Sequence, residues 1–169
     1  MQLQDYASAE KDLYAAIKQS RKSYTVYRTL YSALEAQGKD DEAKKVLNDA
    51  LQLSGSSSED YYNRGMIYVD LQDYTNAADM LNKSYDKGYK AALLGLGEVS
   101  YTQQDYDTAL TYYGKYFDEV DISSVDASLA AKAYNQYAAV LLAKGEYEKA
   151  AQACESGLTY NDRESDAAL

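Results

Sequence analysis

The sequence contains no His, no Pro and no Trp, and only one Cys and one Phe among its 169 residues. Histidine is the side chain whose ordinary pKa lies nearest to neutral pH. Its absence removes the usual general base, the imidazole metal ligand and any triad built on histidine. The many carboxylates do not have the spacing of a calcium-binding loop. The sequence therefore predicts no catalytic residue, no bound metal and no cofactor, and we expect a protein that is not an enzyme.

Long apolar runs are also absent. No stretch approaches a membrane span, which needs about 18 uninterrupted apolar residues, and residues 1–5 lack the basic and apolar regions of a signal peptide. The single cysteine, Cys154, cannot form an intramolecular disulfide, which fits a reducing compartment without requiring one. We therefore expect a soluble chain with no direct membrane insertion, either cytoplasmic or exported as part of a longer protein.

Positive charge is scarce as well. The chain has 17 Lys and Arg against 27 Asp and Glu, which gives a formal net charge of -10, and its basic residues form no stripe. Such a chain has no electrostatic footprint for nucleic acid or for an anionic membrane. The partners that we expect are proteins or peptides of neutral or basic character. The 20 Tyr residues make tyrosine the main aromatic packing residue.

A short phrase that ends in alanine is repeated along the chain, as in residues 72–77 (QDYTNA) and 104–109 (QDYDTA). The alanines of the five copies are Ala9, Ala43, Ala77, Ala109 and Ala150. They are separated by 34, 34, 32 and 41 residues, so the basic period is 34. A fixed period of this length is typical of a repeat array.

Apolar residues on both sides of each phrase have helical spacing, which predicts a turn between two antiparallel helices. Within residues 24–57, the first helix carries Tyr27, Leu30, Tyr31 and Leu34, and the second carries Ala43, Leu47, Ala50 and Leu51. Gly38 and Gly145 stand where a first helix should end, a position that favours left-handed backbone, and other phrases have Gln there. The Asp that follows in three phrases can accept hydrogen bonds from free amides of the next helix.

The period, the turn phrase and the size pattern resemble those of the tetratricopeptide repeat over nearly the whole chain. The large aromatic residue early in the first helix is matched by Tyr27, Tyr61 and Tyr134, with Leu93 in the fourth repeat. The small residue one turn later is matched by Gly65, Gly97 and Ala138, whereas the second repeat has the bulkier Tyr31. The resemblance implies an all-α fold, a right-handed superhelix (solenoid) of antiparallel helix-turn-helix repeats. Cys154 falls on a core position of the pattern, so we predict a buried packing residue there.

We interpret residues 1–169 as a single array cut from a longer one. Its approximate repeats are 1–23 (partial), 24–57, 58–89, 90–130, 131–164 and 165–169, the start of a further repeat. The 41-residue spacing between Ala109 and Ala150 contains an insertion near 118–126. A short loop and then a long first helix from about Ser124 to Lys144 is the favoured interpretation, and an extended preceding helix is the alternative. Neither end has the polar capping helix that closes a stable array, so we expect weak self-association through the uncapped ends.

Two corners carry signals for the start of a helix. Ser56 and Ser57 are candidate caps because acidic residues follow them within one turn. Ser123, followed by Asp126, also fits a helix start, with a hydroxyl capping free amides and a carboxylate favoured by the helix dipole.

In this family the first helices of successive repeats line a concave inner surface, and the resemblance implies a non-catalytic scaffold that binds a protein or peptide there. The residues that we predict for this peptide-binding groove are Arg28, Tyr62, Asn63, Met66, Leu94, Glu98, Tyr101 and Asn135. They combine an apolar centre with polar flanks, as binding sites commonly do. In the alternative, the apolar members pack against neighbouring repeats and the chain is a structural spacer or self-assembly module without a peptide in the groove.

Some family members hold the free C-termini of chaperones with a carboxylate clamp of Lys, Asn and Arg on this inner surface. Here only Asn63 matches a clamp residue, because Arg28 stands in place of a lysine and Ser32 in place of an asparagine. The expected basic pair falls on Ala91 and Gly95. Since this mode of binding depends on its cations, we do not expect clamp binding.

Overall fold

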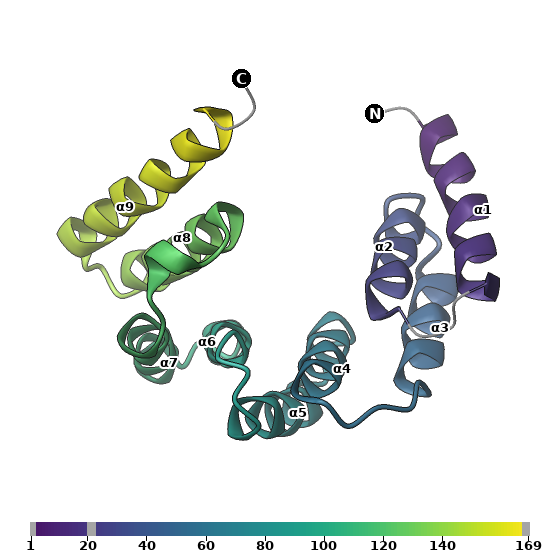
Figure 1. Cartoon of the computed structure of the whole chain (residues 1–169), viewed down its shortest axis with the longest axis horizontal. Coiled ribbons are helices and arrows are strands. Elements are labelled where there is room, and N and C mark those ends of the chain that lie inside the picture. Colours follow the sequence, from purple (N-terminus) through teal and green to yellow (C-terminus); the bar gives the residue numbers. More distant parts are fainter. Residues whose placement is uncertain (1–2, 20–22, 167–169) are drawn as a thin grey trace. The chain divides into compact units, whose positions relative to one another are not determined.

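The computed structural model describes residues 3–19 and 23–166, which form nine α-helices and no strand (Figure 1). The helices are α1 (Leu3–Gln19), α2 (Tyr24–Glu35), α3 (Asp40–Leu51), α4 (Ser58–Asp70), α5 (Tyr74–Asp86), α6 (Ala92–Thr102), α7 (Tyr106–Glu119), α8 (Ala127–Ala143) and α9 (Tyr147–Asp166). A 3-10 turn, η1 (Ile122–Ser124), lies between α7 and α8. The predicted all-α helical repeat solenoid is therefore confirmed.

The chain divides into two compact units, residues 1–80 and 81–169, with the boundary inside α5. In the N-terminal unit, α1 packs against α2, α2 against α3, and α3 against α4. In the C-terminal unit, α6 packs against α7, α7 against α8, and α8 against α9, as Figure 1 shows for the ribbons. The pairs α2/α3, α6/α7 and α8/α9 are the helical hairpins expected from the turn phrases.

The repeated alanines are buried in four of the five repeats. Ala43, Ala77 and Ala109 are fully buried and Ala150 is 1% exposed, while Ala9 of the partial first repeat is half-buried. A small side chain at these positions lets two helix backbones approach closely. The agreement of four alanines from four repeats supports the sequence register along most of the chain.

Each unit has its own apolar core. In the N-terminal unit the buried residues are Tyr24, Tyr27, Leu30, Leu34, Ala43, Val46, Leu47, Ala50 and Ile67, and α1 adds Leu13 and Ile17 at the margin. In the C-terminal unit a cluster of Ala138, Leu141, Ala150 and Ala153 joins α8 to α9. Tyr113 and Tyr116 of α7 are almost completely buried, so tyrosine does fill core positions as the composition indicates.

The turns between paired helices use left-handed backbone, as expected. The φ angle is 72° at Gly38 and 77° at Gly145, and the glutamines that replace glycine have 60° at Gln72 and 63° at Gln104. Glycine takes this conformation without strain, whereas a side chain with a Cβ atom pays for it. The turn therefore adopts left-handed backbone even where glutamine replaces glycine.

The aspartates after these turns cap the next helix. The Asp105 carboxylate accepts a hydrogen bond of 3.2 Å from the Thr108 amide, and Asp73 accepts one of the same length from Asn76. These bonds satisfy backbone donors that have no partner inside the helix. These two phrases thus each end one helix and start another.

The insertion adopts the favoured arrangement of a short connection followed by a long first helix. Helix α8 has 17 residues, against 12 in α2, 13 in α4 and 11 in α6. It begins at Ala127, later than the expected Ser124, because Asp126 is the capping residue and accepts from the amides of Ser128 and Leu129. Ser123 is instead held inside η1 by the Asp121 carboxylate.

At the other end of the chain, α9 continues to Asp166, into the segment where a further repeat is expected to begin. The last residues of that segment, 167–169, lie outside the described residues, as do residues 1 and 2. The prediction of self-association through these ends stays a prediction.

The corner before α4 allows a direct test of a capping box. The Ser57 hydroxyl accepts a 3.1 Å hydrogen bond from the Asp60 amide, and the Asp60 carboxylate accepts a 2.9 Å bond from the Ser57 amide. We expect Ser57→Ala to lower the free energy of unfolding by about 1 kcal/mol, because the capping hydroxyl is lost. Urea denaturation followed by circular dichroism measures this change.

Ser56→Ala is the matched control, because the Ser56 side chain is exposed and outside the capping box. An equal loss in both variants would contradict the capping role. The effect should also depend on pH, since hydrogen bonds from Ser57 hold the pKa of Asp60 below its usual range. A carboxyl with a lowered folded-state pKa stabilises the fold above its unfolded pKa. Its contribution is lost as the pH falls through the lowered value.

Candidate functional site

The eight residues predicted for the groove fall into two groups, one in each unit. In the N-terminal unit they are Arg28 on α2 and Tyr62, Asn63 and Met66 on α4. In the C-terminal unit they are Leu94, Glu98 and Tyr101 on α6 and Asn135 on α8. All eight lie on first helices of repeats.

A polar notch lies on the first helices of the N-terminal unit. It is a cavity of about 320 Å³ lined by Thr25, Arg28, Thr29 and Ser32 of α2 and by Asn63 of α4. The Thr29 hydroxyl donates to the Thr25 carbonyl at 2.9 Å. The side chains of Thr25, Ser32 and Asn63 form no hydrogen bond within the described ranges. The notch thus presents hydroxyl and amide groups that can pair with the backbone of a peptide.

Arg28, predicted to set the polarity of a ligand, is already engaged. Its Nε atom lies 2.7 Å from Oδ2 of Asp70, and its Nη2 atom lies 3.2 Å from Oδ1 of the same carboxylate. This two-point geometry joins α2 to the last residue of α4 and fixes the guanidinium plane. Because Asp70 balances the charge, the polar notch is close to neutral, which suits uncharged peptide groups better than a free carboxylate.

The apolar members of the predicted groove offer a ligand little surface. Met66 is 3% exposed and Leu94 is 4% exposed, so both side chains serve as packing residues. Tyr62 is half-buried and already interacts with another group of the chain. Tyr101 is 38% exposed, and its ring centroid lies 5.8 Å from that of Tyr106. Of the expected apolar floor, Tyr101 is therefore the member with the most accessible side chain.

The polar members of the C-terminal group include one connection that the sequence did not predict. The Glu98 carboxylate on α6 accepts a 3.1 Å hydrogen bond from Nε2 of Gln136 on α8. The other amide atom, Oε1 of Gln136, is buried and has no hydrogen-bond partner within the described part of the chain. A buried carbonyl oxygen without a donor costs free energy. A ligand amide that reached it would recover that cost. Asn135, next to it, is exposed.

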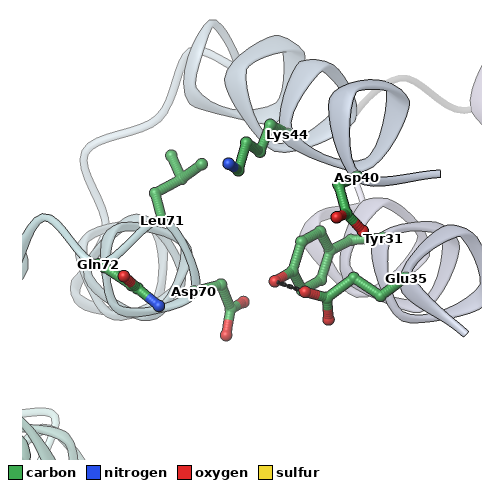
Figure 2. Close-up of a pocket in the computed structure, with 7 residues that line it drawn as sticks. All are labelled: Tyr31, Glu35, Asp40, Lys44, Asp70, Leu71 and Gln72. Atoms are coloured by element: carbon green, nitrogen blue, oxygen red, sulfur yellow. Dashed lines mark hydrogen bonds between the residues drawn. The ribbon is translucent and has the colours of Figure 1, made fainter. Parts of the chain in front are cut away.

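A second cavity in the N-terminal unit, which we name the acidic notch, lies between α2, α3 and the end of α4 (Figure 2). It measures about 280 Å³ and is lined by Tyr31, Glu35, Asp40, Lys44, Asp70, Leu71 and Gln72. The Tyr31 hydroxyl donates to the Glu35 carboxylate, and burial, followed by this bond, raises the pKa of Tyr31. The one indication of this cavity in the sequence is Tyr31, which stands where the repeat normally has a small residue.

The acidic notch does not gather its carboxylates into a metal site, and no group of three or more Cys, Asp or Glu side chains elsewhere in the described residues could hold a metal ion. The helices of that same part of the chain include none that is long and apolar enough to cross a bilayer.

The prediction of a buried Cys154 is wrong, because this side chain is exposed. Helix α9 packs on α8 through Ala150, Ala153 and Gly157, at spacings i, i+3 and i+7. The residue at i+4 then turns toward solvent. The family pattern places its apolar residue at i+4, and this chain uses i+3 instead.

Comparisons with known proteins agree with the repeat pattern. Residues 62–125 match the family described as tetratricopeptide repeat. No curated protein matches the chain. Three similar solved structures are MamA, a tetratricopeptide repeat protein from Parabacteroides merdae, and YrrB, described as a TPR protein with an unusual peptide-binding site.

The likeness to these structures is one of fold. MamA is 20% identical with a TM-score of 0.57, and the match covers 96% of this chain and 92% of MamA. The Parabacteroides merdae protein is 22% identical with a TM-score of 0.65, covering 92% and 59%. YrrB is 22% identical with a TM-score of 0.50, covering 92% and 77%.

The helical hairpins and the buried alanine at each turn define a helical-repeat protein. The match over residues 62–125 specifies the class of that segment further, as a tetratricopeptide repeat.

Proposed function

We propose that the chain is a non-catalytic scaffold that binds a protein or peptide through the first helices of its repeats. The observation that carries this proposal is the polar notch, a cavity in which Thr25, Ser32 and Asn63 present polar groups that are not used within the described fold. Concave sites with a few converging polar groups are the usual places for ligand binding. The notch is distinct from the packed core beneath it.

The chemistry of the notch favours an extended peptide segment bound by its backbone. An asparagine carboxamide can donate to a peptide carbonyl and accept from a peptide amide, and the hydroxyls can do either. With Arg28 neutralised by Asp70, no free cation in the notch selects a carboxylate. The net charge of -10 favours approach of a neutral or basic segment.

To test this proposal, a peptide that binds the purified chain is first selected from a library of random 12-residue peptides. Affinity of a selected peptide for the parent and for the double variant Ser32→Ala with Asn63→Ala is then measured by fluorescence anisotropy. We expect the double variant to bind about 30-fold more weakly, because each of the two lost hydrogen bonds contributes about 1 kcal/mol.

Asn48→Ala is the control variant, since Asn48 is an exposed asparagine on the second helix α3 and its amide bonds only to the Lys44 carbonyl. It should bind the peptide as the parent does. If the notch variant also binds like the parent, the notch is not the site. If the library yields no binder at all, the chain acts as a structural spacer or self-assembly module.

A further inference from the structure

The insertion between α7 and α8 creates a cavity that the repeat pattern does not contain. It lies in the C-terminal unit and measures about 690 Å³, more than either notch. We name it the aromatic pocket; its lining residues are Gly114, Phe117, Asp118, Val120, Asp121, Ile122, Ser123, Tyr134, Tyr137 and Tyr160. Helices α7, α8 and α9 and the turn η1 all contribute to it, and α8 packs on both neighbouring helices (Figure 1).

Four aromatic rings line the pocket. Phe117 and Tyr134 are stacked with ring centroids 4.7 Å apart, and Tyr134 is stacked with Tyr160 at 5.9 Å. Tyr137 meets the Phe117 ring edge to face at 5.5 Å. All four rings are half-buried, unlike Tyr113 and Tyr116 of the same unit, so each keeps exposed surface. Aromatic faces carry partial negative charge and attract cations.

Two carboxylates lie at the rim of the pocket. Asp118 and Asp121 are exposed, and Asp121 is held in place by hydrogen bonds of 3.0 and 2.7 Å from the amide and hydroxyl of Ser123. The described residues that line the pocket include no lysine or arginine. The nearby Lys90 and Lys115 both pair with Glu119, which is not a lining residue. The negative charge of the rim is thus left without a cation among the described residues that line the pocket.

We propose that the aromatic pocket binds an arginine side chain of a partner protein. A guanidinium is planar, so it can stack on a ring face while its N–H groups donate to a carboxylate at the edge of its plane. The pocket supplies both features: ring surface from three helices, and carboxylates at the end of α7 (Asp118) and in the connection to α8 (Asp121). The charge of the whole chain, -10, acts in the same direction by attracting a basic segment. This site is independent of the polar notch, which belongs to the other unit.

The experiment titrates the ¹⁵N-labelled chain with four short peptides, acetyl-Gly-Gly-X-Gly-Gly-amide, in which X is arginine, citrulline, lysine or trimethyllysine. Citrulline keeps the shape of arginine and removes its charge. We expect the arginine peptide to shift the amide signals of residues around the pocket, such as Gly114 and Ser123, and to bind at least tenfold more tightly than the citrulline peptide.

Two variants test the two parts of the site. Asp118→Asn removes one rim charge with almost no change of shape, and Phe117→Leu removes a ring face while keeping an apolar side chain. Each should weaken binding of the arginine peptide at least fivefold. Asp86→Asn is the matched control, because Asp86 is exposed at the end of α5 and its loss changes the net charge equally. This control should bind as the parent does.

Several results would overturn the proposal. They are equal binding of the arginine and citrulline peptides, tighter binding of trimethyllysine than of arginine, shifts confined to other parts of the chain, or unchanged binding by Asp118→Asn. If Phe117→Leu fails to fold by circular dichroism, Asp118→Asn still decides the question. The double variant Ser32→Ala with Asn63→Ala should leave arginine binding unchanged, so failure of this site and failure of the polar notch are distinguishable.

Discussion

Replacing Gly97 with Ala is expected to lower the free energy of unfolding by about 1 to 3 kcal/mol. A Cβ atom at this position of α6 would lie 2.6 Å from Cζ of Tyr113, well inside contact distance. The Tyr113 side chain is 1% exposed on α7, so the ring has no free space into which to move. Overpacking therefore outweighs the gain of about 1 kcal/mol that alanine has over glycine inside a helix.

The same substitution at Gly114 should have the opposite sign. Gly114 also lies inside a helix, α7, but an added Cβ atom meets nothing within 4 Å. We expect Gly114→Ala to raise the free energy of unfolding by roughly 0.5 to 1 kcal/mol through helix propensity alone. Urea denaturation of both variants measures the two changes in the free energy of unfolding. Equal changes at the two positions would mean that the α6/α7 contact is not as close as described.

Replacing Leu30 with Ala is expected to lower the free energy of unfolding by about 2 to 5 kcal/mol. Leu30 of α2 is completely buried in the core of the N-terminal unit, where α1, α2 and α3 meet, and the truncation leaves a cavity as well as losing apolar contact. The measurement is again the free energy of unfolding in urea.

Leu142→Ala is the matched control, because Leu142 also lies on a first helix, α8, but is 51% exposed. A change within about 0.5 kcal/mol is expected there. If the two substitutions lower the free energy of unfolding equally, the assignment of inward and outward faces in these helices is wrong.

Most of the fold could be predicted because its signals are local. The alanine phrase, the left-handed turn and the helical spacing each lie within one hairpin, so Ala43, Gly38 and Ser57 could be assigned from neighbouring residues. Even the long helix after the insertion could be expected from the number of inserted residues, although it is capped by Asp126 and begins later than predicted. Cys154 shows the limit, since a change from i+4 to i+3 packing in α9 is decided by the fit of two helix surfaces.

The candidate site was less predictable because it depends on contacts between repeats. The sequence placed Arg28 on the inner surface but gave no reason why it should pair with Asp70. It placed Met66 in a binding surface, whereas the structure buries it. The aromatic pocket combines residues of three helices and a turn that lie 46 positions apart, from Gly114 to Tyr160, and no local pattern connects them.

The pairing of Arg28 with Asp70 also limits how this array can be rearranged. Repeat proteins are often treated as modules that can be duplicated, exchanged or deleted one at a time, because each repeat contacts only its neighbours. Here the two ends of one ion pair lie in successive repeats, 42 residues apart. A copy of residues 24–57 moved elsewhere would carry a half-buried guanidinium without its carboxylate. The two repeats therefore form one exchangeable module, and a transplant should move them together.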